Sequence, residues 1–173
     1  MTKKKIIGAS IGNCVHVAGI YRFLSLAEQY QYTSYFLGPA IPPNILIQNI
    51  INKKPQRVIV GYRLSENAAL SLFNDLRHQL EGHHLLGKSI FILSCTPALE
   101  KIARNTGIFQ YIFTGKESFD EILESIQQFP VGTTVEKKYP STLPERIIAK
   151  KPFPLLRHHF GRPSVNETIA GVR

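Results

Sequence analysis

The sequence lacks the features that place a chain in a membrane or in an oxidising compartment. It contains no run of about 18 apolar residues, the minimum for a transmembrane helix. Its basic start, MTKKK, is not followed by an apolar stretch of signal-peptide length. Two cysteines, Cys14 and Cys95, are too few for a disulfide framework in 173 residues. We therefore expect a cytoplasmic protein with no membrane partner.

Three common signatures of phosphate chemistry are also missing. The stretch GASIG (8–12) is not a G-x-G-x-x-G fingerprint, and no acidic residue follows the second predicted strand to hold a ribose. No P-loop is present. A response-regulator site needs a carboxylate at the end of the first strand, where Ser10, Asn13 and Cys14 stand instead. Dinucleotide, nucleotide and phosphoacceptor functions are therefore not expected.

Charge is unevenly distributed along the chain. The net charge is +9, and residues 130–173 carry 8 Lys and Arg against 3 Asp and Glu, a net of +5. A basic segment can bind nucleic acid or an acidic protein surface. Because no nucleic-acid motif accompanies the charge, nucleic acid is not an expected partner.

The first 129 residues alternate between short apolar strands and helices. The predicted strands cover 5–10, 32–38, 57–62, 89–94 and 109–113, and the predicted helices cover 18–30, 43–54, 66–82, 97–107 and 117–129. Short apolar strands in this order predict a doubly wound, flavodoxin- or Rossmann-like, five-stranded parallel sheet with helices on both faces. Ligands of such folds bind beyond the carboxyl ends of the strands.

Residues 130–173 break this pattern and are predicted to form a Pro-rich basic tail. Six prolines argue for an extended segment, and its apolar residues include Phe153 and Phe160. Exposed apolar residues in a basic segment usually mark a protein contact. Ser164 and Glu167 then form a capping box close to the end of the chain. We expect either an interaction arm, which could join two copies of the chain, or the start of a following domain.

The loop after the first strand, IGNCVHVAG (11–19), resembles the first loop of the cobalamin (vitamin B12)-binding domain of B12-dependent mutases and methyltransferases. The family pattern there is Asp-x-His-x-x-Gly, and His16 and Gly19 match its histidine and glycine. The similarity runs in register over about residues 4–128. VIVGYRLS (58–65) falls at the family's Val-Val-Gly-x-Ser-x-Leu, and FILSCTP (91–97) falls at its Gly-Gly pair and proline.

Several positions depart from the family pattern. Cys14 stands at the aspartate, Arg63 at the serine, and Ser65 at the leucine, while Ser94 and Cys95 replace the two glycines. The resemblance implies that His16 is the lower ligand of cobalt. It implies a cofactor-binding set made up of Gly12, Asn13, Cys14, His16, Gly19, Gly61, Arg63, Ser65, Ser94, Cys95, Thr96 and Gly115.

The implied function is that of a cobalamin-binding module or small subunit of a mutase-type isomerase, which holds the corrin base-off. No residue of the chain has the character of a substrate-handling acid or base, so a partner barrel subunit or domain would carry the substrate. Family methyltransferase modules usually carry a helical cap before this domain, and the first predicted strand begins too early in this sequence for one, so we expect adenosylcobalamin rather than methylcobalamin.

Three alternatives accompany this interpretation. The chain could be a relative that has lost the cofactor and acts as a protein-binding or regulatory module, or it could be a corrinoid methyl-transfer carrier. A zinc site formed by Cys14, His16 and Cys95 is the weakest of the three, because a C-x-H pair lacks a second pair of ligands.

Overall fold

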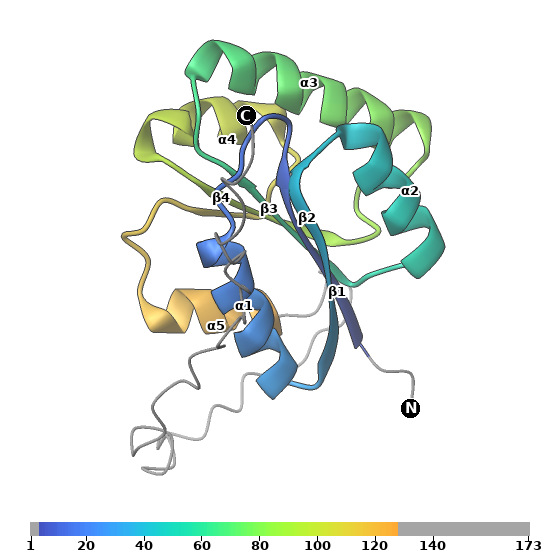
Figure 1. The fold of residues 1–173 in the computed structure, drawn as a ribbon, viewed down its shortest axis with the longest axis vertical. Helices are drawn as coiled ribbons and strands as arrows, with labels where there is room; N and C mark the ends of the chain where they lie inside the picture. Colours follow the sequence, from blue (N-terminus) through green and yellow to red (C-terminus); the bar gives the residue numbers. More distant parts are fainter. Residues whose placement is uncertain (1–3, 128–173) are drawn as a thin grey trace, which may run out of the picture. The chain divides into compact units, whose positions relative to one another are not determined.

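The computed structural model describes residues 4–127, which form a five-stranded, all-parallel sheet with the order β2-β1-β3-β4-β5 (Figure 1). The predicted fold class is therefore confirmed. The predicted tail, with its interaction arm and the domain boundary at 129/130, lies outside the described residues. The strands are β1 (Lys4–Ile11), β2 (Tyr32–Ile41), β3 (Arg57–Tyr62), β4 (Ile90–Cys95) and β5 (Tyr111–Phe113).

Helices cover both faces of the sheet. One face carries α1 (Ala18–Gln29) and α5 (Phe119–Gln127), and the other carries α2 (Pro43–Lys53), α3 (Glu66–Gly82) and α4 (Glu100–Thr106) (Figure 1). A short 3₁₀ turn, η1 (Pro97–Leu99), precedes α4. None of the helices within residues 4–127 combines the length and the apolar character needed to cross a membrane.

The central strands are apolar along their length because each of their faces is covered. In β1, Ile6 packs toward α1 and α5, while the next residue, Ile7, packs toward α2 and α3. Ile59 and Val60 of β3 divide in the same way. Buried parallel strands require this pattern, since neighbouring side chains point to opposite faces.

The largest departure from the predicted element boundaries is at the end of β2. The glycine at position 38 predicted that this strand would end there, but it continues to Ile41. The pairing with β1 shifts register near Gly38, so Ala9 lies opposite Gly38 and Ile11 lies opposite Ile41. The irregularity accommodates the turn residues without ending the strand.

Smaller corrections concern β4, β5 and the helix between them. The fourth strand is 90–95 rather than 89–94, and the fifth begins at Tyr111 rather than at 109. Gln110 is not in the strand, although its backbone N–H and side-chain oxygen both bond to Phe91. The predicted helix 97–107 begins as the 3₁₀ turn and ends at Gly107, which adopts the left-handed conformation of a helix C-cap.

A buried Arg-Tyr pair fastens α5 to the amino-terminal edge of the sheet. Arg57 Nε donates to the carbonyl oxygen of Ser125 at 2.6 Å, and the Tyr32 hydroxyl donates to that of Ile126 at 3.0 Å. A second guanidinium nitrogen of Arg57 donates to the Tyr32 hydroxyl. Burial raises the pKa of Tyr32, against the opposing effect of Arg57. These donors satisfy carbonyl groups at the negative end of the helix dipole.

The first prediction concerns this pair. Tyr32→Phe removes one hydroxyl and leaves buried hydrogen-bonding groups without a partner, so it should lower the free energy of unfolding by about 1–3 kcal/mol. Tyr35→Phe on the same strand is the control, and its effect should stay within about 0.5 kcal/mol. Urea unfolding measures both. Equal losses in the two variants would contradict the role assigned to the Tyr32 hydroxyl.

Candidate functional site

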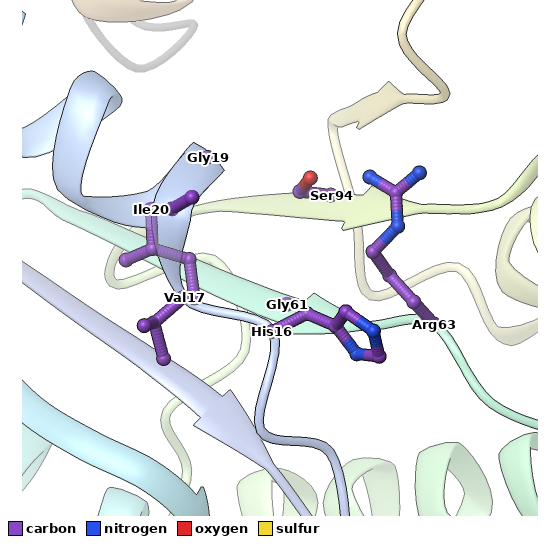
Figure 2. Close-up of a pocket in the computed structure, with 8 residues that line it drawn as sticks. His16, Val17, Gly19, Ile20, Gly61, Arg63 and Ser94 are labelled. Carbon is purple, nitrogen blue, oxygen red and sulfur yellow. The ribbon is translucent and has the colours of Figure 1, made fainter.

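A pocket of about 450 Å³ opens at the carboxyl edge of the sheet. It lies beside the topological switch point between β1 and β3, where the strand order reverses. It lies between the loop that precedes α1, the first turn of α1, and the ends of β3 and β4 (Figure 2). This is where ligands of doubly wound sheets bind. The lining residues are His16, Val17, Ala18, Gly19, Ile20, Gly61, Arg63 and Ser94.

The loop between β1 and α1 is anchored to the end of β2. Gly12, at a φ of 61°, donates its backbone N–H to the Ile41 carbonyl at 3.0 Å. Ala40 donates its N–H to the carbonyl of Cys14 at 2.9 Å. These bonds depend on the continuation of β2 past Gly38. The additional residues of β2 therefore set the position of the loop that carries His16.

Cys14 lies beneath His16 and contacts its ring. The Cys14 side chain is completely buried, whereas His16 is exposed, and the distance from Sγ to Nδ1 is 3.4 Å. When Nδ1 carries the proton, its N–H donates to the sulfur; when the thiol donates, Nδ1 accepts. The first arrangement leaves Nε2 with a lone pair that can bind a metal. The loop therefore presents an imidazole with one nitrogen engaged and the other available.

Glycines allow the first turn of α1 to lie close to the strand ends. A Cβ atom on Gly61 would be 2.8 Å from Ile20 Cδ1 and 3.4 Å from the His16 carbonyl oxygen. A Cβ atom on Gly19 would be 3.7 Å from Ser94 Oγ, so the serine hydroxyl occupies space next to this glycine. Helix α1 therefore packs closely against β3 at Gly61, and the Ser94 hydroxyl borders the start of the helix.

The charged side chains at this edge of the sheet differ in whether another group of the protein binds them. Arg63 is exposed and lines the pocket, and no ion pair joins it to another residue within 4–127. Glu100 is paired with Arg104 at 2.7 Å. Glu117 accepts hydrogen bonds from the backbone N–H groups of Thr114 and Gly115 at 2.6 and 2.8 Å. Partial burial raises the pKa of Glu117, but these hydrogen bonds outweigh it, and the pKa is lowered overall.

The predicted site residues fall into two groups. His16, Gly19, Gly61, Arg63 and Ser94 come together in the pocket. The others are not among the residues that line it. Among them Cys95 is buried, and Ser65 and Thr96 are the residues that precede α3 and η1. Those outside the pocket lining are Gly12, Asn13, Cys14, Ser65, Cys95, Thr96 and Gly115.

Sequence reasoning missed three lining residues, Val17, Ala18 and Ile20. The sequence pattern could have identified them, because they lie between His16 and the first turn of the predicted helix 18–30. The zinc alternative was wrong. Within residues 4–127, no group of three or more His, Cys, Asp or Glu side chains is close enough together to hold a metal ion.

Comparison with known proteins gives a result at the level of fold. No family model matches the chain, and no curated protein matches it. A cobalamin-binding protein from Desulfitobacterium hafniense superposes with a TM-score of 0.57 at 21% identity, over 64% of this chain and 53% of that one. The methanol:cobalamin methyltransferase complex of Methanosarcina barkeri gives a TM-score of 0.60 at 13% identity, over 76% and 50%.

The chain has the fold of cobalamin-binding domains. It spans about half the length of each of these two proteins, 53% and 50%. The same fold serves signalling proteins: a receiver domain from Vibrio parahaemolyticus has a TM-score of 0.53 at 12% identity, over 72% of this chain and 88% of that one. Because the fold is shared, function has to be argued from the site.

The second prediction concerns the buried thiol at the end of β4. Burial raises the pKa of Cys95 to about 11, so about one molecule in a thousand carries the thiolate at pH 8. In a Cys14→Ser variant, iodoacetamide should modify Cys95 about a hundredfold or more slowly in the native protein than in urea. Mass spectrometry measures both rates. Rapid labelling of the native protein would show that Cys95 is an accessible, reactive thiol.

Proposed function

We propose that this domain binds cobalamin at the carboxyl edge of the sheet, with His16 Nε2 as the lower ligand of cobalt. The observation that carries the proposal is the His16–Cys14 contact. An exposed imidazole stands at the rim of the pocket, and a buried side chain engages its Nδ1. A ring nitrogen that is held from behind fixes the orientation of a metal-binding histidine. The fold likeness and the match of His16 and Gly19 to the family loop support the assignment.

The residues around the pocket suit a large cofactor bound at its edge. Gly19 and Gly61 remove side-chain bulk where α1 meets β3, and Ser94 and Arg63 offer hydrogen-bond donors at the ends of β4 and β3. The loop residues Gly12, Asn13, Ser65, Thr96 and Gly115, with buried Cys14 and Cys95 behind them, complete the proposed contact region. Bound cobalamin supplies a reactive bond from cobalt to carbon. This chain's residues would orient the cofactor, while a partner barrel subunit or domain would hold the substrate.

Two types of cobalamin chemistry are candidates. The fit of Gly12 to the mutase form of the family's loop favours adenosylcobalamin and an isomerase partner. The likeness to the Methanosarcina barkeri methyltransferase complex favours a carrier of methyl groups. Equilibrium binding of the two cofactors separates the candidates. Tighter retention of adenosylcobalamin supports the isomerase module, and tighter retention of methylcobalamin supports the carrier.

The third prediction tests His16. After mixing with aquocobalamin and desalting, the protein should retain a visible spectrum typical of histidine ligation. His16→Ala should remove that signature and weaken binding, because the lower ligand is lost. His78→Ala on α3, also an exposed histidine, is the control and should leave the spectrum unchanged. An unaltered spectrum in His16→Ala rules out ligation, and a colourless native protein favours a module that has lost the cofactor.

The fourth prediction tests Cys14. A thiol is a weaker hydrogen-bond acceptor than a carboxylate, so Cys14→Asp should hold the Nδ1 proton more firmly and tighten cobalamin binding by about tenfold. Cys14→Ala removes the partner of Nδ1 and should weaken binding instead. Titration of the visible spectrum gives both affinities. Weaker binding by the Asp variant, if that variant remains folded, would mean that Cys14 serves packing alone.

A further inference from the structure

We propose that Arg63 is a specificity-determining residue that binds the phosphodiester of cobalamin's nucleotide loop. The domain would then prefer corrinoids that carry this loop to corrinoids that lack it. The inference rests on the proposed function and assigns to one residue the recognition of one part of the cofactor. It concerns the position at which the family that the loop resembles has a serine and this chain has a cation.

The first support is the position of Arg63. Its side chain extends from the end of β3 on the same side of Gly61 as the His16 ring (Figure 2). The Ser94 side chain stands on the neighbouring strand, β4, and also lines the pocket. The residue is exposed, and it lines the pocket rather than an outer helix surface. An anion at the pocket mouth would therefore meet a guanidinium group close to the proposed cobalt ligand.

The second support is that the nearby carboxylates already have binding partners within the protein. Arg63, Glu100 and Glu117 all lie close enough to Cys95 to influence the pKa of its thiol. Glu100 is paired with Arg104, and Glu117 is held by the backbone of its own loop. No ion pair within residues 4–127 takes up the Arg63 charge. The Arg63 guanidinium group is therefore available to bind an anion in the pocket.

The third support is the wall of the pocket formed by the start of α1. The helix begins after Val17 with no side-chain cap and no acidic residue in its first turn. Ala18 and Gly19 line the pocket, so backbone N–H groups of the first turn are available there, and Gly19 presents no side chain. The positive end of a helix dipole stabilises an anion. The first turn therefore adds donors to a pocket that already contains Arg63 and Ser94.

The chemistry of the ligand identifies the anion. The amide side chains of cobalamin are neutral, and its nucleotide loop contains one phosphodiester with a single negative charge. A guanidinium group binds phosphate oxygens through two parallel hydrogen bonds, which a neutral serine cannot do. Cobinamide has the same corrin ring but lacks the nucleotide loop. The Arg63 contact should therefore contribute to the binding of cobalamin and not to that of cobinamide.

The experiment compares equilibrium binding of aquocobalamin and aquocobinamide to four proteins: the full chain, Arg63→Gln, Arg63→Lys and Lys88→Gln. Arg63→Gln should weaken cobalamin binding by about 10- to 100-fold and leave cobinamide binding within about twofold. Arg63→Lys retains the charge but not the paired hydrogen bonds, and it should give an intermediate loss for cobalamin. Lys88→Gln removes an equal charge from the exposed loop before β4, at the opposite edge of the sheet, and should change neither affinity.

The outcomes separate this inference from the proposed function. Equal losses for both corrinoids in Arg63→Gln, or no loss for either, overturn the phosphodiester contact and leave cobalamin binding in place. Failure of the native protein to bind either corrinoid overturns the proposed function and this inference with it. Inorganic phosphate provides the last arm. If phosphate binds the native protein through Arg63 while the preference for cobalamin does not depend on Arg63, the pocket is a site for free phosphate and the inference is overturned.

Discussion

The attachment of the loop after β1 to the end of β2 is the constraint on which the candidate site depends. Two backbone hydrogen bonds, from Gly12 to Ile41 and from Ala40 to Cys14, fix the course of the chain between the first strand and α1. Ala40 adopts a left-handed conformation, with a φ of 53°, that costs a residue with a side chain about 1 kcal/mol or more. The site loop is thus held by a locally strained strand end, a feature often found at functional sites.

The same attachment explains why Cys14 and His16 can act as a pair. With the Cys14 carbonyl bonded to β2, its side chain is directed into the core formed with α2 and α3, where it is completely buried. His16, two residues later, is exposed at the rim, yet its Nδ1 remains within 3.4 Å of the sulfur. A thiol at this buried position avoids the desolvation cost of a carboxylate, but it is also a weaker acceptor. Cys14 therefore packs well below His16, but it binds the Nδ1 group of the ring more weakly than a carboxylate would.

The close packing of α1 places a second condition on the site. Ile20 is almost fully buried, and Cβ atoms added to Gly8 or Gly61 would approach it to 2.7 or 2.8 Å. A ligand group that entered between α1 and β3 would have to displace this side chain. The mouth of the pocket, where Arg63 and Ser94 stand, is open to a ligand without such a rearrangement.

The fold could be predicted from sequence because its signals are local. The helix expected at 66–82 is α3 with the same bounds, since an amphipathic pattern and an acidic first turn define it. The extension of β2 could not be predicted, because Gly38 and Pro39 are turn residues and only pairing with β1 keeps them in the strand. For the site, the loop motif predicted His16 and Gly19. The burial of Cys14 and the engagement of Glu117 depend on tertiary contacts that residue spacing does not encode.

Electron paramagnetic resonance of the protein with cob(II)alamin tests the central claim most directly. The unpaired electron of cobalt(II) couples to the nitrogen of its axial ligand, and the number of lines reports the nuclear spin of that nitrogen. If His16 is the lower ligand, labelling the protein uniformly with ¹⁵N should change the three-line splitting of ¹⁴N into the two-line splitting of ¹⁵N. A three-line pattern that persists in the labelled protein would come from the cofactor's own base, and it would contradict the account.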